Sequence, residues 1–109
     1  MLKIEIVKSE EIIKKVTAVI KKNKINNASL MVIGGIDSCC ISTMSKDDAK
    51  KYISCVYNEP LELTGTGEIV DGIIHIHVTL GREDKTTLMG HLQWGKVESW
   101  FVHVYINEF

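Results

Sequence analysis

Apolar and polar residues alternate along much of this chain. That pattern is typical of half-buried β-strands, because successive side chains of a strand point to opposite faces. The strictest example is segment 73–80, where one set of alternating positions is Ile74, Ile76, Val78 and Leu80, and the other is Ile73, His75, His77 and Thr79. Similar patterns predict further strands at 2–7, 29–33, 36–43, 51–57, 61–66 and 97–106. The chain is therefore predicted to be rich in β-structure.

One segment follows the helical period instead. Its apolar residues recur at the spacing of a single helix face: Ile12, Ile13, Val16, Val19 and Ile20. Ser9 is predicted to cap the N-terminus of this helix, with Glu10 and Glu11 where the helix dipole favours carboxylates. The lysines between 14 and 24 fall off the apolar stripe, which favours a solvated face over a phosphate-binding patch. We predict an α+β fold, a mostly antiparallel β-sheet packed against one main N-terminal helix.

Glycine and turn residues separate the predicted strands. Gly34-Gly35 is expected to end or bulge one strand, and Asp71-Gly72 is the signal of a tight hairpin, because this pair adopts the positive φ angles of a type I′ turn. In the last strand, Trp100 shares a face with aliphatic residues, while Phe101, His103 and Tyr105 share the other. That second face is both aromatic and polar, which favours a surface covered by another subunit.

Length and composition fit one soluble domain spanning residues 1–109, with 45% hydrophobic and 25% charged residues. The net charge of −1 disfavours DNA binding by the bare chain, because DNA-binding domains usually carry a basic excess. We find no signal-peptide pattern and no apolar run of membrane-spanning length. The cysteines, Cys39, Cys40 and Cys55, are odd in number and suit a reducing compartment. A cytoplasmic protein without membrane partners is expected.

Three of the four histidines lie within segment 73–92. His75 and His77 project from one face of one predicted strand, and His91 follows Gly90, a residue that tolerates the backbone angles of a close turn. Three neutral imidazoles that converge are a ligand set for zinc or another divalent metal. We therefore predict a metal site formed by His75, His77 and His91. In the alternative interpretation, these are ordinary polar residues that hydrogen-bond across the sheet or a subunit interface.

The histidine segment also carries a family resemblance. His75-Ile76-His77-Val78-Thr79-Leu80, a polar turn, Gly90-His91-Leu92 and a β-rich C-terminus resemble the plant and prokaryote conserved (PPC, DUF296) domain. Leu61 to Gly67 and Ala28 to Gly35 are similar to further stretches of that family, so the resemblance covers nearly the whole chain. It implies a PPC-like α+β fold in a stand-alone prokaryotic protein, and a homotrimer built on the sheets.

Three functions follow as hypotheses. The first is a trimeric binding module with a divalent-metal site and a small-molecule ligand, in which Glu62 and His103 are candidates to lie near the metal. The second is a DNA-associated regulator, by analogy with the family. The chain has no AT-hook, however, and Glu59-Pro60-Leu61-Glu62-Leu63 lacks the arginine of the plant partner-binding stretch. The third is a metal-dependent enzyme with Glu62 or Asp71 as general base. We place binding ahead of catalysis and assign no catalytic residue.

Overall fold

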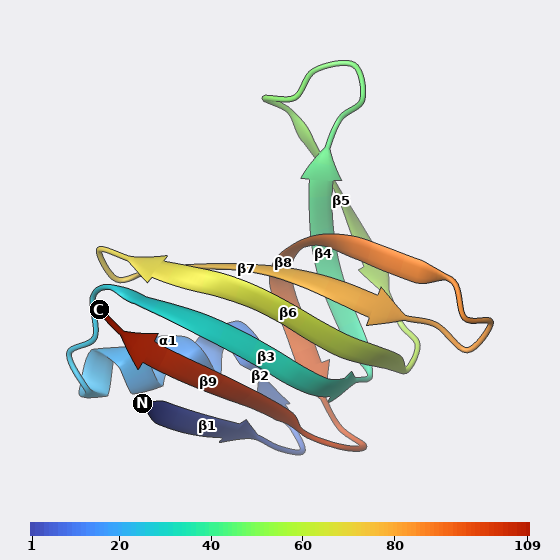
Figure 1. Cartoon of the computed structure of the whole chain (residues 1–109). Helices are drawn as coiled ribbons and strands as arrows, with labels where there is room; N and C mark the ends of the chain where they lie inside the picture. Colours follow the sequence, from blue (N-terminus) through green and yellow to red (C-terminus); the bar gives the residue numbers. More distant parts are fainter.

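The computed structural model describes residues 1–109 as one helix and nine strands in a single antiparallel sheet (Figure 1). The elements are β1 (Leu2–Ile6), β2 (Glu10–Glu11), α1 (Ile12–Lys22), β3 (Ala28–Ile36), β4 (Ser38–Met44), β5 (Tyr52–Tyr57), β6 (Leu61–Val70), β7 (Ile73–Gly81), β8 (Thr87–Val97) and β9 (Val102–Glu108). The strands are ordered β1-β9-β3-β6-β7-β8-β4-β5, and β2 pairs with β8. The predicted α+β class is confirmed.

The inner face of the sheet and the apolar stripe of α1 form one hydrophobic core. In β7, Ile76, Val78 and Leu80 are fully buried, whereas His75 and His77 are exposed, so the alternation predicted for this strand is correct. Helix α1 buries Ile12, Val16 and Ile20 in the same cluster and packs against β8 and β1. Each fully buried aliphatic side chain contributes about 1.5–3 kcal/mol to folding, so this core holds β7 with its histidines outward. Helix α1 is too short to cross a membrane.

The helix begins two residues later than the sequence pattern predicts. Ser9 lies in a turn with a φ of 73°, and Glu10 and Glu11 form the short strand β2 opposite Val97 and Lys96. Glu11 is the N-cap, because its carboxylate accepts hydrogen bonds from the backbone amides of Ile13 at 2.8 Å and Lys14 at 3.0 Å. Pairing with β8 thus overrides the preference of serine for the cap position.

Several strand boundaries also differ from prediction, and β8 forms where no strand is predicted. Strand β3 continues through Gly34-Gly35, because glycine at 34 leaves room for the backbone of Phe101, which a side chain there would strike. The strand predicted at 36–43 starts only at Ser38. The last strand starts at Val102, and Trp100 is 75% exposed in the connection from β8 to β9 rather than on a strand face.

The β4–β5 hairpin projects from the rest of the sheet (Figure 1). A register shift between Cys40 and Ile41, where β4 pairs with β8, accompanies this change of direction. Only the base of the hairpin is covered: Tyr52 to Val56 are exposed, whereas Ile41 and Ser42 are buried. The pairing of Ser42 with His91 places the base of this hairpin next to the predicted metal site.

Candidate metal site

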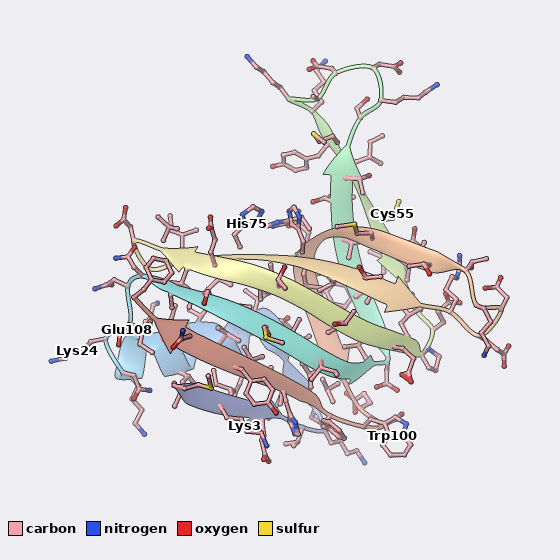
Figure 2. All side chains as sticks on the ribbon, viewed as in Figure 1. Lys3, Lys24, Cys55, His75, Trp100 and Glu108 are labelled. Carbon is pink, nitrogen blue, oxygen red and sulfur yellow. The ribbon has the colours of Figure 1, made fainter.

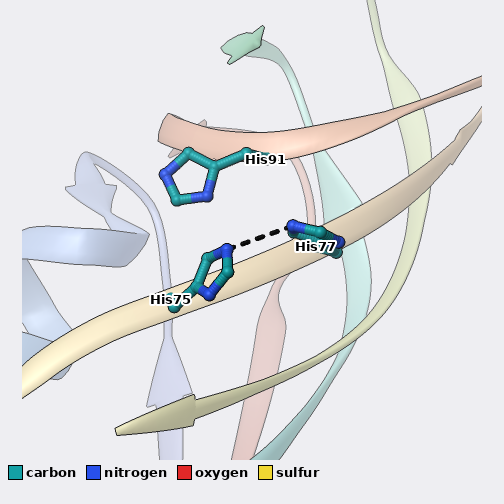
Figure 3. Close-up of side chains that lie close together, drawn as sticks. All are labelled: His75, His77 and His91. Carbon is teal, nitrogen blue, oxygen red and sulfur yellow. Dashed lines mark hydrogen bonds between the residues drawn. The ribbon is translucent and has the colours of Figure 1, made fainter. Parts of the chain in front are cut away.

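The predicted ligands His75, His77 and His91 lie on two neighbouring strands and share one face of the sheet (Figure 3). Asp71 and Gly72 have φ angles of 50° and 79°, as the predicted type I′ hairpin requires, and they set the register of β6 with β7. Strand β8 then returns antiparallel to β7 with His91 opposite His77. The sheet therefore brings the three imidazole rings together from two strands.

The spacing of the ring nitrogens suits a metal ion. Nε2 of His75 and Nε2 of His77 share a hydrogen bond of 3.1 Å (Figure 3), and one ligand nitrogen from each of the three rings falls within 4.8 Å of the others. Two nitrogens bound to one tetrahedral zinc ion are ~3.3 Å apart, given Zn–N distances of ~2.0–2.1 Å. The β7 pair thus already has nearly this separation, and the ligand nitrogen of His91 lies within 4.8 Å of both.

His91 is the most enclosed of the three rings. It is half-buried, while His75 and His77 are exposed. Burial lowers the pKa of His91 below its ordinary value, and the charges of His75 and His77 lower that pKa further. A lowered pKa favours the neutral imidazole near pH 7, and only the neutral form has a free nitrogen lone pair for a metal.

The sequence predicts that Gly90 allows a close turn before His91, but its role in the structure is different. It lies within β8, opposite Val78, and does not turn the chain. A β-carbon at this position would lie 2.8 Å from the carbonyl oxygen of Ser42 and 3.3 Å from side-chain atoms of Ile41 and Thr43. Glycine therefore allows β8 to approach β4 closely beside His91.

Two other predicted neighbours of the site lie elsewhere. Glu62 pairs with Gly81, four residues beyond His77, which is ~13 Å along the strand at ~3.3 Å per residue. His103 pairs with Ile33 on β3, and its ring stacks on Phe101 with centroids 4.3 Å apart. Since β3 and β6 separate β9 from β7, His103 does not lie near the triad of the same chain, so this candidate is not an outer ligand there.

The carboxylates proposed as general bases are also not part of the cluster. Asp71 occupies the β6–β7 turn, four residues before His75. Glu62 lies opposite Gly81, four residues beyond His77. The nearest carboxylate by register is Glu68, which stands directly opposite His75 on β6 and lines a hollow with His75 and His77. Counting back from the Asp71-Gly72 turn would have identified Glu68, since a two-residue hairpin pairs 70 with 73 and 68 with 75.

A pocket of about 670 Å³ adjoins the triad between β8 and the projecting hairpin. Figure 2 shows His75 beside the base of this hairpin. The lining residues are Ser42, Thr43, Met44, Tyr52, His75, His77, Met89, Gly90, His91 and Gln93. Sequence reasoning missed this pocket, because no local pattern indicates that β4 pairs with β8.

Comparison with known proteins agrees with this fold. A profile of the Plants and Prokaryotes Conserved (PCC) domain matches residues 2–109, so the chain belongs to this family, as the resemblance implied. No curated protein matches the chain.

Three solved structures illustrate the similarity. A "putative DNA-binding protein" from Bacteroides thetaiotaomicron is 25% identical, with a TM-score of 0.85 over 98% of this chain and 77% of that one. A metal-containing protein from Archaeoglobus fulgidus is 22% identical (TM-score 0.82, 98% and 79% covered). A plant- and prokaryote-conserved (PPC) protein from Pyrococcus horikoshii is also 22% identical (TM-score 0.83, 99% and 79% covered). The last two similarities establish the fold alone.

Proposed function

We propose that this chain is a divalent-metal-binding module with His75, His77 and His91 as its protein ligands. The observation that carries the proposal is the convergence of three imidazoles, with a 3.1 Å contact between the two ring nitrogens on β7. Zinc fits this set best, because it accepts three histidine nitrogens in a tetrahedron and leaves a fourth position open. A metal bound in this way would act as a Lewis acid with one exchangeable position.

Two further observations support a metal. The lowered pKa of His91 favours the neutral ring that a metal needs, and the exposure of His75 and His77 provides an entry route. The similar protein from Archaeoglobus fulgidus is described as metal-containing. Catalysis ranks behind binding, because neither carboxylate that we considered as general base adjoins the three rings.

Metal analysis of protein produced without a histidine tag tests this proposal. We expect about one equivalent of zinc or a related divalent ion per chain after dialysis, and loss of this ion in His75→Ala. His103→Ala is the matched control, because His103 stacks on Phe101 away from the triad and its removal should leave the metal content unchanged. Metal-free wild-type protein that also fails to take up added zinc would contradict the proposal.

We infer that the protein is a homotrimer. The outer face of β3 and β9 carries Met31 and Ile33, which are 61% and 55% exposed, next to Tyr105 and His103 by register. An exposed apolar face of this kind is usually covered by a partner, and the family resemblance suggests further copies of the chain. Sedimentation equilibrium should give the mass of three 12.3 kDa chains, whereas a monomer at micromolar concentration would reject the inference.

DNA-associated regulation is the second candidate function. It is favoured by the description of the similar Bacteroides thetaiotaomicron protein and disfavoured by the net charge of −1. We expect no tight duplex binding by the chain alone, because phosphate contacts supply most non-specific affinity. A gel shift with sub-micromolar affinity at physiological salt and a steep salt dependence would instead favour the DNA function.

We also propose a cytoplasmic location, which the three free cysteines support.

A further inference from the structure

We propose that the pocket beside the triad takes a small organic monocarboxylate that carries a short apolar group. One carboxylate oxygen would face the metal ion, and the apolar group would lie against the projecting β4–β5 hairpin. This inference rests on the proposed metal site and specifies the chemical class of its ligand.

The charge of the site favours an anion. The pocket lining contains no aspartate, glutamate, lysine or arginine. A divalent ion on three neutral imidazoles would keep its full charge of +2. Glu68 lines a different hollow, which His75 and His77 also border. The single negative charge of its carboxylate would offset only half of the +2 charge of the metal ion. A bound cation is the largest local charge in such a site, so the open coordination position should prefer an anionic oxygen to a neutral one.

The buried base of the pocket offers a hydrogen-bond donor for a second oxygen. Ser42 is 5% exposed and pairs directly with His91. Its hydroxyl oxygen accepts a hydrogen bond from the side-chain amide of Gln93 at 3.0 Å. The hydroxyl hydrogen of Ser42 is therefore available to an acceptor in the pocket. A carboxylate provides two oxygens, one for the metal and one for such a donor.

The wall of the pocket that the β4–β5 hairpin and Met89 form is largely apolar. Met44 and Tyr52 are cross-strand neighbours in the hairpin and are 71% and 69% exposed, and Met89, two residues before His91 on β8, is 59% exposed. Methionine side chains adapt to irregular apolar groups, and a tyrosine ring adds a flat surface. The pocket volume of about 670 Å³ falls within the usual range for small-molecule sites. These side chains would shield an aliphatic or aromatic group of a few carbons.

Four small probes that separate charge from shape test the proposal. The protein is first loaded with zinc and, in parallel, with cobalt, and metal uptake is confirmed by calorimetry. Isovalerate, acetate, isovaleramide and isoamylamine are then titrated. Isovalerate should bind at least tenfold more tightly than each of the other three, and it should change the visible spectrum of the cobalt ion, which reports a new ligand on the metal. Metal-free protein should not bind isovalerate.

A matched pair of variants tests the role of the lining. Met89→Glu places a negative charge in the pocket and should weaken isovalerate binding about tenfold relative to Met89→Gln, which is of similar size and uncharged. Met89 is exposed, so both variants should fold. Equal binding of acid and amide, equal binding of acetate and isovalerate, or equal affinity in the two variants would overturn this inference while leaving the metal site intact. Failure to take up metal would overturn both proposals.

Discussion

Replacing Glu11 by alanine should lower the free energy of unfolding by about 2.5–4 kcal/mol. The Glu11 carboxylate accepts three backbone hydrogen bonds: from Ile13 at 2.8 Å, from Lys14 at 3.0 Å and from Gly95 at 2.9 Å. Losing an N-cap costs ~1 kcal/mol, which accounts for the two helix amides. The amide of buried Gly95 would also lose a charged acceptor, and such a hydrogen bond contributes ~1.5–3 kcal/mol. The carboxylate thus joins the start of α1 to β8, the strand that carries His91.

Urea unfolding followed by tryptophan fluorescence measures this loss, and Glu10→Ala is the matched control. Glu10 accepts hydrogen bonds from the amide of Val7 and from the ammonium group of Lys15, and its side chain is 30% exposed. A partly exposed ion pair and one exposed amide contribute about 1 kcal/mol or less. If Glu11→Ala loses less than ~0.5 kcal/mol, or no more than Glu10→Ala, the role of Glu11 as the link between helix and sheet is refuted.

Two further variants test other parts of the structure. Asp37 accepts hydrogen bonds from the Ser99 hydroxyl and from the amides of Ser99 and Glu98; the Ser99 hydroxyl contributes most to lowering the pKa of Asp37. The stabilisation is therefore present above the unfolded pKa of ~3.9 and is lost as the pH falls through the lower folded pKa. Asp37→Asn should be less stable than wild type at pH 7, with a difference that shrinks toward pH 2; a constant difference in urea midpoint would contradict this. Gly90→Ala should weaken zinc binding at least tenfold, because its β-carbon would lie 2.8 Å from the Ser42 carbonyl oxygen and displace His91. Gly81→Ala, with only a 3.5 Å contact to Glu62, should bind zinc like wild type, and equal affinities in the two glycine variants would count against this packing role.

Local patterns predict the centre of this fold well. The strict alternation in 73–80 and the Asp71-Gly72 turn specify strand, face and register at once, because a two-residue turn leaves only one pairing for β6 and β7. His91 then reaches the same face because β8 is adjacent and antiparallel. The histidine cluster could therefore be predicted from sequence, although β8 is not among the predicted strands and Gly90 acts by close packing rather than by turning the chain.

The features that sequence reasoning missed depend on contacts between distant segments. Glu10 and Glu11 carry no strand pattern and become strand only because β8 offers a free edge to them. The β8–β9 connection ends the predicted last strand because Asp37, about sixty residues earlier, binds the amides at 98 and 99. The pocket likewise needs the pairing of β4 with β8 and the register shift between Cys40 and Ile41, neither of which leaves a local signal.

Calorimetric titration of zinc into tag-free wild type and His77→Ala is the measurement that decides between a metal site and a merely hydrogen-bonded histidine pair. His77 is exposed, so its replacement should leave the stability of the metal-free protein unchanged. Wild type should bind about one zinc ion per chain with a Kd below ~10 μM and should melt at a higher temperature when loaded. His77→Ala should lose at least a hundredfold in affinity, together with the metal-dependent rise in melting temperature. Wild-type binding weaker than ~10 μM, or equal binding by wild type and His77→Ala, would contradict the metal site.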